Sequence, residues 1–187
     1  CLLSRGLGDV YKRQNPYDAK GLLMSAIQED NLVVFSEDKT LLGQKGNVPE
    51  EPYTIEIGKA NVTREGDDLT IVAIGKMVAV AEETAEKLAE DQVSVEVIDL
   101  RSVSPWDQET VLDSVKKTGR LIVIDESNPQ CNIAGDVASV IGDVGFDYLD
   151  GPIKKVTAPD TPVPFAANLE AAYMPVSYTH LTLPTIY

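Results

Sequence analysis

The body of the chain, residues 54–175, alternates between short apolar runs and longer segments in which apolar residues recur every three or four positions. The short runs predict buried strands at residues 69–74, 93–100, 121–124 and 153–156. The recurrence at helical spacing predicts amphipathic helices between them, from Gly75 to about Ala89, from Asp107 to Gly119, and through residues 133–141. This order predicts an α/β fold, with a mostly parallel sheet covered by helices on both faces.

A helix and a short strand are predicted before that body. Apolar residues recur at helical spacing from Tyr17 to Ile27, and Asn15-Pro16 supplies a helix start. The apolar run at residues 32–35 predicts a short buried strand. Residues 37–53 contain two glycines and two prolines among mixed charges and show no periodicity, which is typical of a linker between domains.

The two ends of the chain differ in composition from the rest. Residues 1–14 contain three basic residues and one acid, and residues 176–187 contain no Asp, Glu, Lys or Arg. Both segments resemble translated library-adaptor sequence, so we predict that they are non-native tails. The alternative for residues 1–14 is a targeting peptide, although they lack a continuous apolar stretch and a cleavage-like site. His180, the only histidine, lies in the second tail, so the remainder offers no histidine for acid–base chemistry or metal binding.

Charge and cysteine content exclude several classes of function. A formal net charge of −14 argues against a nucleic-acid partner, because phosphate binding is driven by clustered Lys and Arg, and it favours a basic partner. No stretch approaches the roughly 18 apolar residues that span a bilayer, so we expect no membrane segment. Cys1 and Cys131 lie far apart without CxxC spacing, which indicates neither a zinc site nor a disulfide framework and favours a reducing cytoplasm. We interpret Cys131 as a buried residue at a turn, because no basic partner or second cysteine lies near it.

Motifs that bind nucleotides are absent. The turn after the first strand of the body, residues 74–78, has a single glycine, and the chain contains neither GxGxxG nor GxxxxGK[ST]. We interpret Asp99 and Arg101, at the end of the second strand, as a salt bridge that precedes a turn. Asp18 and Lys20 are interpreted as exposed helix charges rather than catalytic groups.

Several segments are similar to known enzymes. Residues 70–78 (TIVAIGKMV), 97–107 (VIDLRSVSPWD) and 116–126 (KKTGRLIVIDE) together resemble the C-terminal domain shared by transketolase-like thiamine-diphosphate enzymes. The segments that resemble E1 β-subunits of 2-oxo-acid dehydrogenase complexes are residues 16–23, 48–53, 146–150 and 159–165. Those that look closest to acetoin dehydrogenase β-subunits are residues 73–78, 125–131 and 156–159, although pyruvate dehydrogenase β-subunits share most of this framework.

The resemblance implies that the chain is a C-terminal piece of an E1 β-subunit. In that family a thiamine ylid attacks the substrate carbonyl, and a two-carbon unit passes to a lipoyl group on the E2 acyltransferase. The implied cofactors are thiamine diphosphate and Mg²⁺ in the complete heterotetramer, and the implied partners are an E1 α-subunit, a second β-subunit and E2. The family's cofactor-binding glutamate lies upstream of residue 15, so we expect no catalytic or cofactor-binding residue in this chain.

The same resemblance divides the chain into domains. Residues 15–36 correspond to the last helix and strand of a pyrimidine-binding domain, residues 37–53 to a linker, and residues 54–175 to a transketolase C-terminal-like domain. Two alternatives for function stay open. One is another enzyme with this terminal domain, such as a deoxyxylulose-phosphate synthase or a transketolase, and the other is a non-catalytic binding module.

The first site implied by the resemblance is a structural potassium ion at the end of the helix before the linker. The positions that match the family's ligands are Ala26, Ile27, Glu29 and Asn31. Carbonyl groups at a helix C-terminus lack partners within the helix, and hard oxygen ligands suit such a cation. The family more often has aspartate where Glu29 stands, and ordinary helix capping by Asn31 is the alternative interpretation.

The second site is a docking surface for E2, predicted around Asp160, Phe165 and Glu170. The whole chain has a net charge of −14, and residues 1–14 contribute +2 to it. The remaining residues therefore carry −16 and would attract a basic module. Prolines within residues 161–165 cannot continue a helix and predict a loop that presents Phe165 as an apolar anchor. The alternative is that Phe165 packs under the C-terminal segment.

Overall fold

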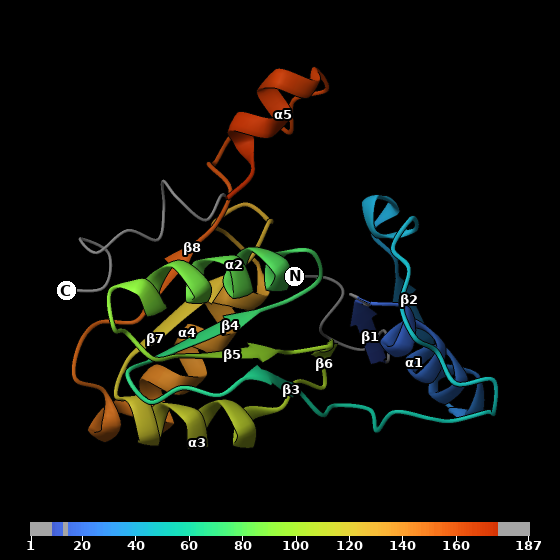
Figure 1. Ribbon diagram of the computed structural model, residues 1–187, viewed down its shortest axis with the longest axis horizontal. Helices are drawn as coiled ribbons and strands as arrows, with labels where there is room; N and C mark the ends of the chain where they lie inside the picture. Colours follow the sequence, from blue (N-terminus) through green and yellow to red (C-terminus); the bar gives the residue numbers. More distant parts are fainter. Residues whose placement is uncertain (1–8, 13–14, 176–187) are drawn as a thin grey trace.

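The computed structural model of the chain describes residues 9–12 and 15–175 and contains two sheets of different size (Figure 1). Within these residues the larger sheet has five strands in the order β3-β5-β4-β7-β8. Its strands are β3 (Asn61–Arg64), β4 (Leu69–Ala73), β5 (Val95–Asp99), β7 (Leu121–Ile124) and β8 (Lys154–Val156). Neighbouring strands run parallel except β3, which is antiparallel to β5. The predicted α/β fold with a mostly parallel sheet is therefore confirmed, and β3 is an edge strand that the sequence pattern did not predict.

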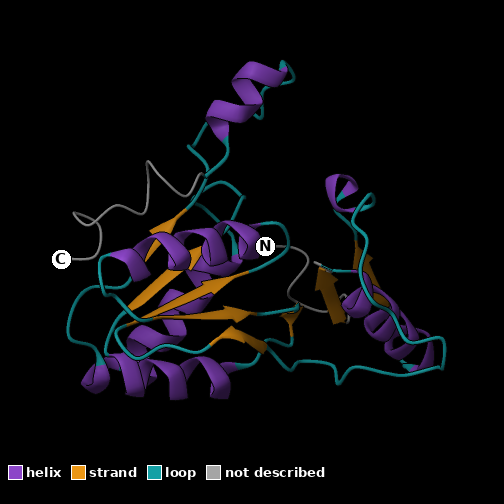
Figure 2. Cartoon of the chain, in the orientation of Figure 1, coloured by secondary structure: helices purple, strands orange, loops and turns teal. Residues whose placement is uncertain are grey.

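Helices cover both faces of this sheet (Figure 2). Helix α2 (Met77–Glu90) lies on one face, and α3 (Gln108–Thr118) and α4 (Ile133–Val144) lie on the other. Successive strand residues point to opposite faces, so Ile71 and Val97 pack under α2 while Val72 and Ile98 pack under α3 and α4. Because the central strands are buried on both faces, they read in the sequence as continuous apolar runs. We refer to residues 58–158 as the sheet domain.

Local sequence explains where the helices of the sheet domain begin and end. Asp107 caps α3 by accepting a hydrogen bond from the Thr110 N–H over 3.1 Å. Gly119 ends the same helix with φ of 69°, a left-handed conformation that costs glycine little. Asn132 caps α4 by accepting from the Gly135 N–H over 2.7 Å. These boundaries lie within one or two residues of the predicted ones.

A smaller group of elements precedes the sheet domain. It contains α1 (Pro16–Gln28), capped by Asn15, then β2 (Val33–Ser36) and the 3-10 helix η1 (Lys39–Leu41). The predicted helix is confirmed, but the prediction that the following strand is buried is wrong. Its side chains are half-buried or exposed, because β2 lies at the edge of a small three-stranded sheet of order β2-β1-β6.

The other two strands of the small sheet come from distant parts of the chain. Strand β1 (Asp9–Lys12) lies in the predicted non-native tail, and β6 (Ser102–Ser104) follows the second long strand of the sheet domain. Strand β1 pairs in parallel with β2 and antiparallel with β6. The unpaired N–H and C=O groups at an open sheet edge can pair with any extended segment, whatever its origin. The pairing of β1 therefore does not test the non-native origin of residues 1–14, which stays a prediction. Cys1, His180 and residues 176–187 lie outside the described residues.

Two short helical elements lie on either side of β8. They are η2 (Phe146–Tyr148), which precedes it, and α5 (Ala167–Tyr173), which follows it. The segment that contains α5 leaves the sheet domain and projects away from it (Figure 1). Among the residues that the structure describes, no helix has the length and apolar character needed to cross a bilayer.

Candidate functional site

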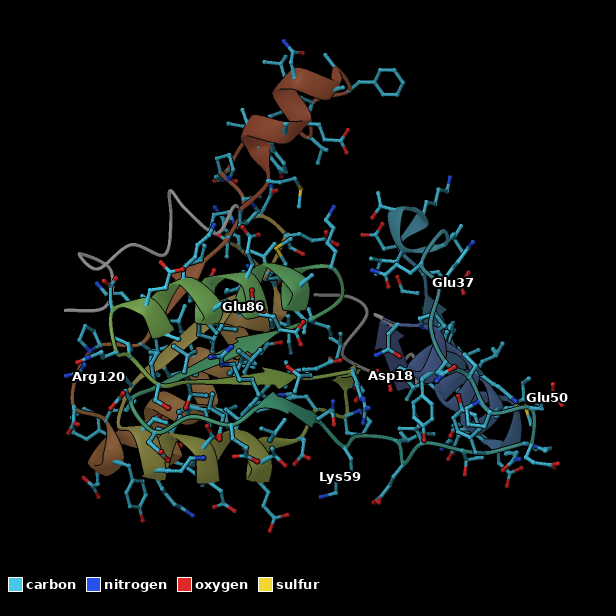
Figure 3. The ribbon with its side chains drawn as sticks, viewed as in Figure 1. Asp18, Glu37, Glu50, Lys59, Glu86 and Arg120 are labelled. Atoms are coloured by element: carbon cyan, nitrogen blue, oxygen red, sulfur yellow. The ribbon has the colours of Figure 1, made fainter. Side chains whose placement is uncertain are left out.

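A buried ion pair joins α1 to the sheet domain. Nη2 of Arg101 donates to Oδ1 of Asp18 over 2.6 Å, and Asn15 Nδ2 donates to the other carboxylate oxygen over 2.7 Å. Asp18 is 1% exposed and lies at the junction between the two parts (Figure 3). The interpretations of Asp18 as an exposed charge and of Arg101 as the ion-pair partner of Asp99 are therefore wrong. Sequence spacing could not show this contact, because the two residues lie 83 positions apart.

Asp99 is a second buried carboxyl group at this junction. Its Oδ1 accepts a hydrogen bond from the Arg101 backbone N–H over 2.8 Å, and its Oδ2 has no hydrogen-bond partner in the described part of the chain. Burial in a low-dielectric environment raises the pKa of Asp99 to about 8. Asp99 is therefore mostly protonated near neutral pH and carries no charge toward Arg101, whose backbone has a left-handed φ of 56°.

A polar crevice of about 420 Å³ opens beside the ion pair. The charged residues in its wall are Lys45, Asp18 and Arg101. Much of the rest of the wall comes from residues with amide side chains, namely Asn15, Gln44, Asn47 and Asn61. The crevice lies where α1, the linker and β3 meet, so its walls come from segments that are far apart in the sequence. It therefore depends on the docking of α1 against the sheet domain.

The linker is fixed to α1 by Lys20. The Lys20 ammonium donates to the carbonyl oxygen of Pro49 and to those of Glu50 and Glu51, over 3.0 and 2.9 Å for the latter two. It also lies 5.2 Å from the ring centroid of Tyr53. The interpretation of Lys20 as an exposed helix charge is compatible with these contacts, which lie at the surface and hold residues 49–53 against the helix.

The switch point of the larger sheet carries an ion pair. The switch point is the place between β4 and β7 from which the chain adds β5 on one side of β4 and β7 on the other. Ligands bind at this place in many sheets of this kind. Here Lys76 Nζ lies 3.0 Å from Glu126 Oε2 and 3.7 Å from Asp38 Oδ2. Two carboxylates against one ammonium give this site a negative balance, so the residues present do not fit a diphosphate group. That finding agrees with the absence of a glycine-rich phosphate loop.

The four predicted potassium ligands lie together at the end of α1. Ala26 and Ile27 are in its last turn, and the N–H of Glu29, the C-cap residue, donates to the Ser25 carbonyl over 3.1 Å. Asn31 follows in the exposed turn before β2. The described residues contain no group of three or more His, Cys, Asp or Glu side chains that could hold a metal ion. A site built largely from main-chain carbonyls does not need such a group, so the potassium site stays a prediction.

The three predicted docking residues lie on the projecting segment, residues 160–173, which we call the arm. Gln130 Nε2 donates to Asp160 Oδ2 over 3.1 Å, and Tyr173 Oη donates to Asn128 Oδ1 over 2.5 Å. Both ends of the arm are thus held by the loop between β7 and α4. Phe165 is fully exposed between them, so the alternative that it packs under the C-terminal segment is wrong for this chain.

Cys131 is an exposed free thiol, and the interpretation of it as buried is wrong. It precedes the cap of α4 and has a left-handed φ of 50°. Because it is exposed, the residue lies outside the apolar layer under α4.

The comparison with protein families decides what kind of domain this is. Residues 58–178 match the family described as "Transketolase, C-terminal domain". The chain belongs to this family. A solved structure described as "Split gene transketolase, inactive beta4 tetramer" superposes on this transketolase C-terminal domain and its preceding segment with a TM-score of 0.73. That chain is 25% identical, and the match covers 88% of the present chain and 52% of the other.

Curated relatives of this transketolase C-terminal domain protein are more similar. The "Acetoin:2,6-dichlorophenolindophenol oxidoreductase subunit beta" of Bacillus subtilis (strain 168) is 54% identical over 161 residues, which cover 86% of this chain and 47% of the relative. The subunit of the same name from Cupriavidus necator is 48% identical over 160 residues, with the same coverage. The "Pyruvate dehydrogenase E1 component subunit beta" of Bacillus subtilis is 48% identical over 161 residues, which cover 49% of that relative. The chain spans about half the length of these relatives.

Proposed function

We propose that the chain is part of the β-subunit of a thiamine-diphosphate-dependent dehydrogenase E1 component, with acetoin favoured over pyruvate as substrate. The observation that carries the choice of substrate comes from one organism. Over 161 residues the chain is 54% identical to the acetoin subunit of Bacillus subtilis and 48% identical to its pyruvate counterpart. Transketolase itself has weaker support, because the solved transketolase structure is 25% identical.

The proposed contribution of this chain is assembly and docking rather than chemistry. Thiamine diphosphate and Mg²⁺ would belong to the complete heterotetramer, formed with an E1 α-subunit and a second β-subunit. The carboxylates of Asp38 and Glu126 around Lys76 support the proposal that this chain does not itself hold the diphosphate. A cytoplasmic location accompanies the proposal and can be checked by cell fractionation.

A chimeric β-subunit tests this function. Residues 15–175 replace the homologous 161 residues of the Bacillus subtilis acetoin subunit, and the chimera is produced with the α-subunit of that organism. We expect an assembled enzyme that reduces 2,6-dichlorophenolindophenol with acetoin at a rate within about tenfold of the parent and more slowly with pyruvate. The matched control receives the same segment from the Bacillus subtilis pyruvate subunit. Two results contradict the proposal if the control chimera assembles and is active. One is a test chimera that does not assemble, and the other is a test chimera that assembles but shows no acetoin-dependent activity.

The arm is the proposed docking surface for a basic module of the E2 acyltransferase. Asp160 and Glu170 would steer the module, and the exposed ring of Phe165 would anchor it. Two features support this proposal. The arm is held at both ends by the loop of residues 128–130, and its apolar side chains Val163, Phe165 and Leu169 are exposed.

The test of docking uses the chimeric enzyme with Asp160→Lys and Glu170→Lys together. We expect the association rate with the E2 module to fall and its dependence on salt to weaken, because the attractive field is reversed. Glu86→Lys on the outer side of α2 changes the total charge on a different surface and serves as the matched control (Figure 3). Unchanged rate and salt dependence in the double variant would place the docking surface elsewhere.

A further inference from the structure

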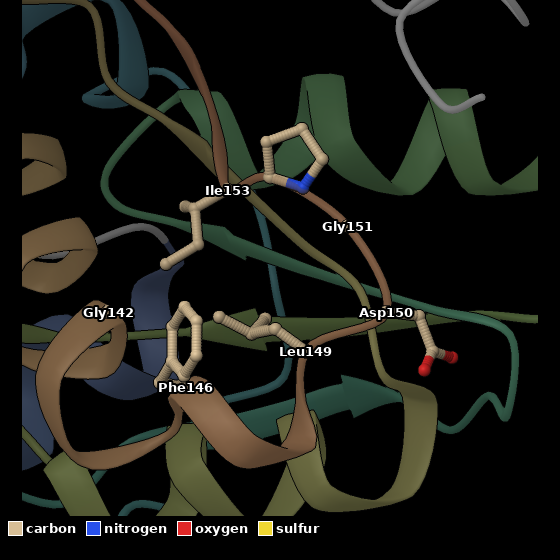
Figure 4. Close-up of a pocket in the computed structure, with 7 residues that line it drawn as sticks. Gly142, Phe146, Leu149, Asp150, Gly151 and Ile153 are labelled. Carbon is tan, nitrogen blue, oxygen red and sulfur yellow. The ribbon is translucent and has the colours of Figure 1, made fainter.

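An apolar surface lies at the end of the sheet domain where α4 passes into β8. A pocket of about 420 Å³ is lined there by Leu149, Pro152 and Ile153, with the Phe146 ring at its border. Figure 4 shows the side chains of Phe146, Leu149 and Ile153 turned toward one another, with Asp150 directed away on the same loop. Phe146 is 72% exposed, an unusual degree for a phenylalanine beside an open apolar pocket.

Further exposed apolar side chains extend this surface. Val144 at the end of α4 and Tyr148 in η2 flank Phe146, and about half of each is exposed. We call the surface formed by Val144, Phe146, Tyr148 and the adjoining pocket the Phe146 patch. The patch shares no residue with the junction ion pair, the switch-point ion pair or the arm, since its residues come from the segment 142–153 alone.

The pocket is open because residue 142 is glycine. A Cβ built on Gly142 would meet only the Cδ1 atom of Ile153, at 3.9 Å, which is ordinary van der Waals contact. A larger side chain at this helical position would therefore extend into the pocket without displacing the backbone. This property allows the pocket to be filled without weakening the fold, because glycine is a poor helix former.

Carboxylates surround the Phe146 patch. Asp143, Asp147 and Asp150 are exposed, and none of the three forms an ion pair with a cation in the described residues. The ammonium group of Lys116 lies 5.7 Å from the Tyr148 ring centroid and is paired with Asp113 over 2.8 Å. Within residues 142–153 the charged side chains are these three aspartates, and Lys154 and Lys155 follow in β8. The carboxylates on this segment are part of the overall charge of −14 and would attract a basic group.

We propose that the Phe146 patch docks a basic peptide segment of a partner protein, with one bulky apolar side chain in the pocket and Lys or Arg on either side of it. An apolar anchor removes the exposed ring and pocket wall from water, and the flanking cations meet Asp143 and Asp147. An acidic segment, such as the arm of a second copy of this chain, would be repelled by the same carboxylates. The chemistry of the patch thus favours a basic occupant over self-association.

The experiment uses the full 187-residue chain and two synthetic hexapeptides. In the first, paired lysines stand on both sides of a Leu-Phe centre, and in the second glutamates replace the lysines. We expect the lysine peptide to bind with a dissociation constant on the order of 100 μM at low salt, more weakly as salt rises, and the glutamate peptide not to bind. Binding is measured by calorimetry and by perturbation of the backbone amide signals of residues 142–153.

Three variants make the proposal falsifiable. Phe146→Ser removes the anchor contact, Asp143→Lys with Asp147→Lys reverses the field, and Gly142→Leu fills the pocket. Each should weaken binding of the lysine peptide by about tenfold or more, while Gly142→Leu leaves the unfolding temperature unchanged or raised. Leu169→Ser on the arm and Glu86→Lys on α2 are the matched apolar and charge controls, and both should bind as the parent does.

Other results overturn the proposal. Equal binding of both peptides would show that charge does not select the occupant, and binding that survives all three variants would place the peptide elsewhere. If neither peptide binds and Phe146→Ser converts a dimer to a monomer in sedimentation, the patch is an interface between copies of the chain. If neither peptide binds and the chain is monomeric with and without Phe146, the patch docks no basic segment.

Discussion

The sheet domain and the junction with α1 are held together in different ways. The sheet domain buries continuous apolar layers on both faces of its central strands. At the junction, α1 buries Leu22 and depends on polar contacts: the Asp18–Arg101 ion pair joins it to the sheet domain, and Lys20 holds the linker through carbonyl groups. Apolar burial is spread over many residues and does not depend on the orientation of any one side chain. An ion pair, by contrast, is lost when either partner is removed. We therefore expect that α1 can be released from the sheet domain by changes that leave the sheet intact.

The largest effect is expected in the apolar layer under α3 and α4. Ile98→Ala removes a side chain that is 0% exposed and leaves a cavity between the sheet and the helices. We expect the free energy of unfolding to fall by about 2–5 kcal/mol, measured by urea denaturation. Val163→Ala on the exposed arm is the matched control and should change it by less than about 0.5 kcal/mol. Similar losses in both variants would mean that burial in this layer does not dominate stability.

A smaller and local effect is expected at the junction. Asp18→Ala leaves the Arg101 guanidinium without its carboxylate, and we expect a loss of about 1–3 kcal/mol confined to the contact of α1 with the sheet domain. Hydrogen exchange should rise in residues 16–28 and stay unchanged in β4 and β5. Lys87→Ala, which removes one partner of an exposed pair within α2, is the control and should change neither. Faster exchange throughout the sheet would contradict the separation of the two regions.

Asp99 lies at the boundary of the two regions and gives the junction a pH dependence. Its pKa is raised in the folded chain from 3.8 to about 8, so the unfolded chain loses this proton at a lower pH than the folded chain. Between about pH 4 and pH 8 the unfolded state binds fewer protons at this group, and its contribution to stability falls as pH rises. We expect Asp99→Asn, whose amide oxygen can still accept the Arg101 N–H, to remove this decline. Parallel stability curves for the two proteins across that pH range would show that Asp99 is ionised when folded.

The smallest effect concerns the end of α1. If Ala26, Ile27, Glu29 and Asn31 hold potassium, 100 mM KCl should raise the unfolding temperature of the chimeric β-subunit by a few degrees more than 100 mM NaCl, roughly 1 kcal/mol at ten times the dissociation constant. Glu29→Asp, the residue more common in the family, should increase the difference between the two salts. Equal temperatures in potassium and sodium for both proteins would remove the site.

Local patterns predicted most of the sheet domain. The apolar runs at β4 and β7, the Asp107 cap of α3 and the Gly119 ending could be recognised because each depends on neighbouring residues. The short elements β3, β6 and α5 were not predicted, since three to seven residues carry too little periodicity to distinguish them from loops. At the candidate sites, the sequence predicted the loop that exposes Phe165 and the end of α1, but it misjudged the burial of Asp18 and Cys131.

The sequence by itself determined the fold class and the family, because strand and helix periodicity and the segments similar to E1 β-subunits are properties of adjacent residues. Tertiary structure alone decided that Arg101 pairs with Asp18 rather than with Asp99, and that Lys76 meets Glu126 at the switch point. It also decided that Phe146 stands beside an open pocket. The physical reason is that the charge state and exposure of a side chain depend on what approaches it through space, and the two ion pairs join residues tens of positions apart.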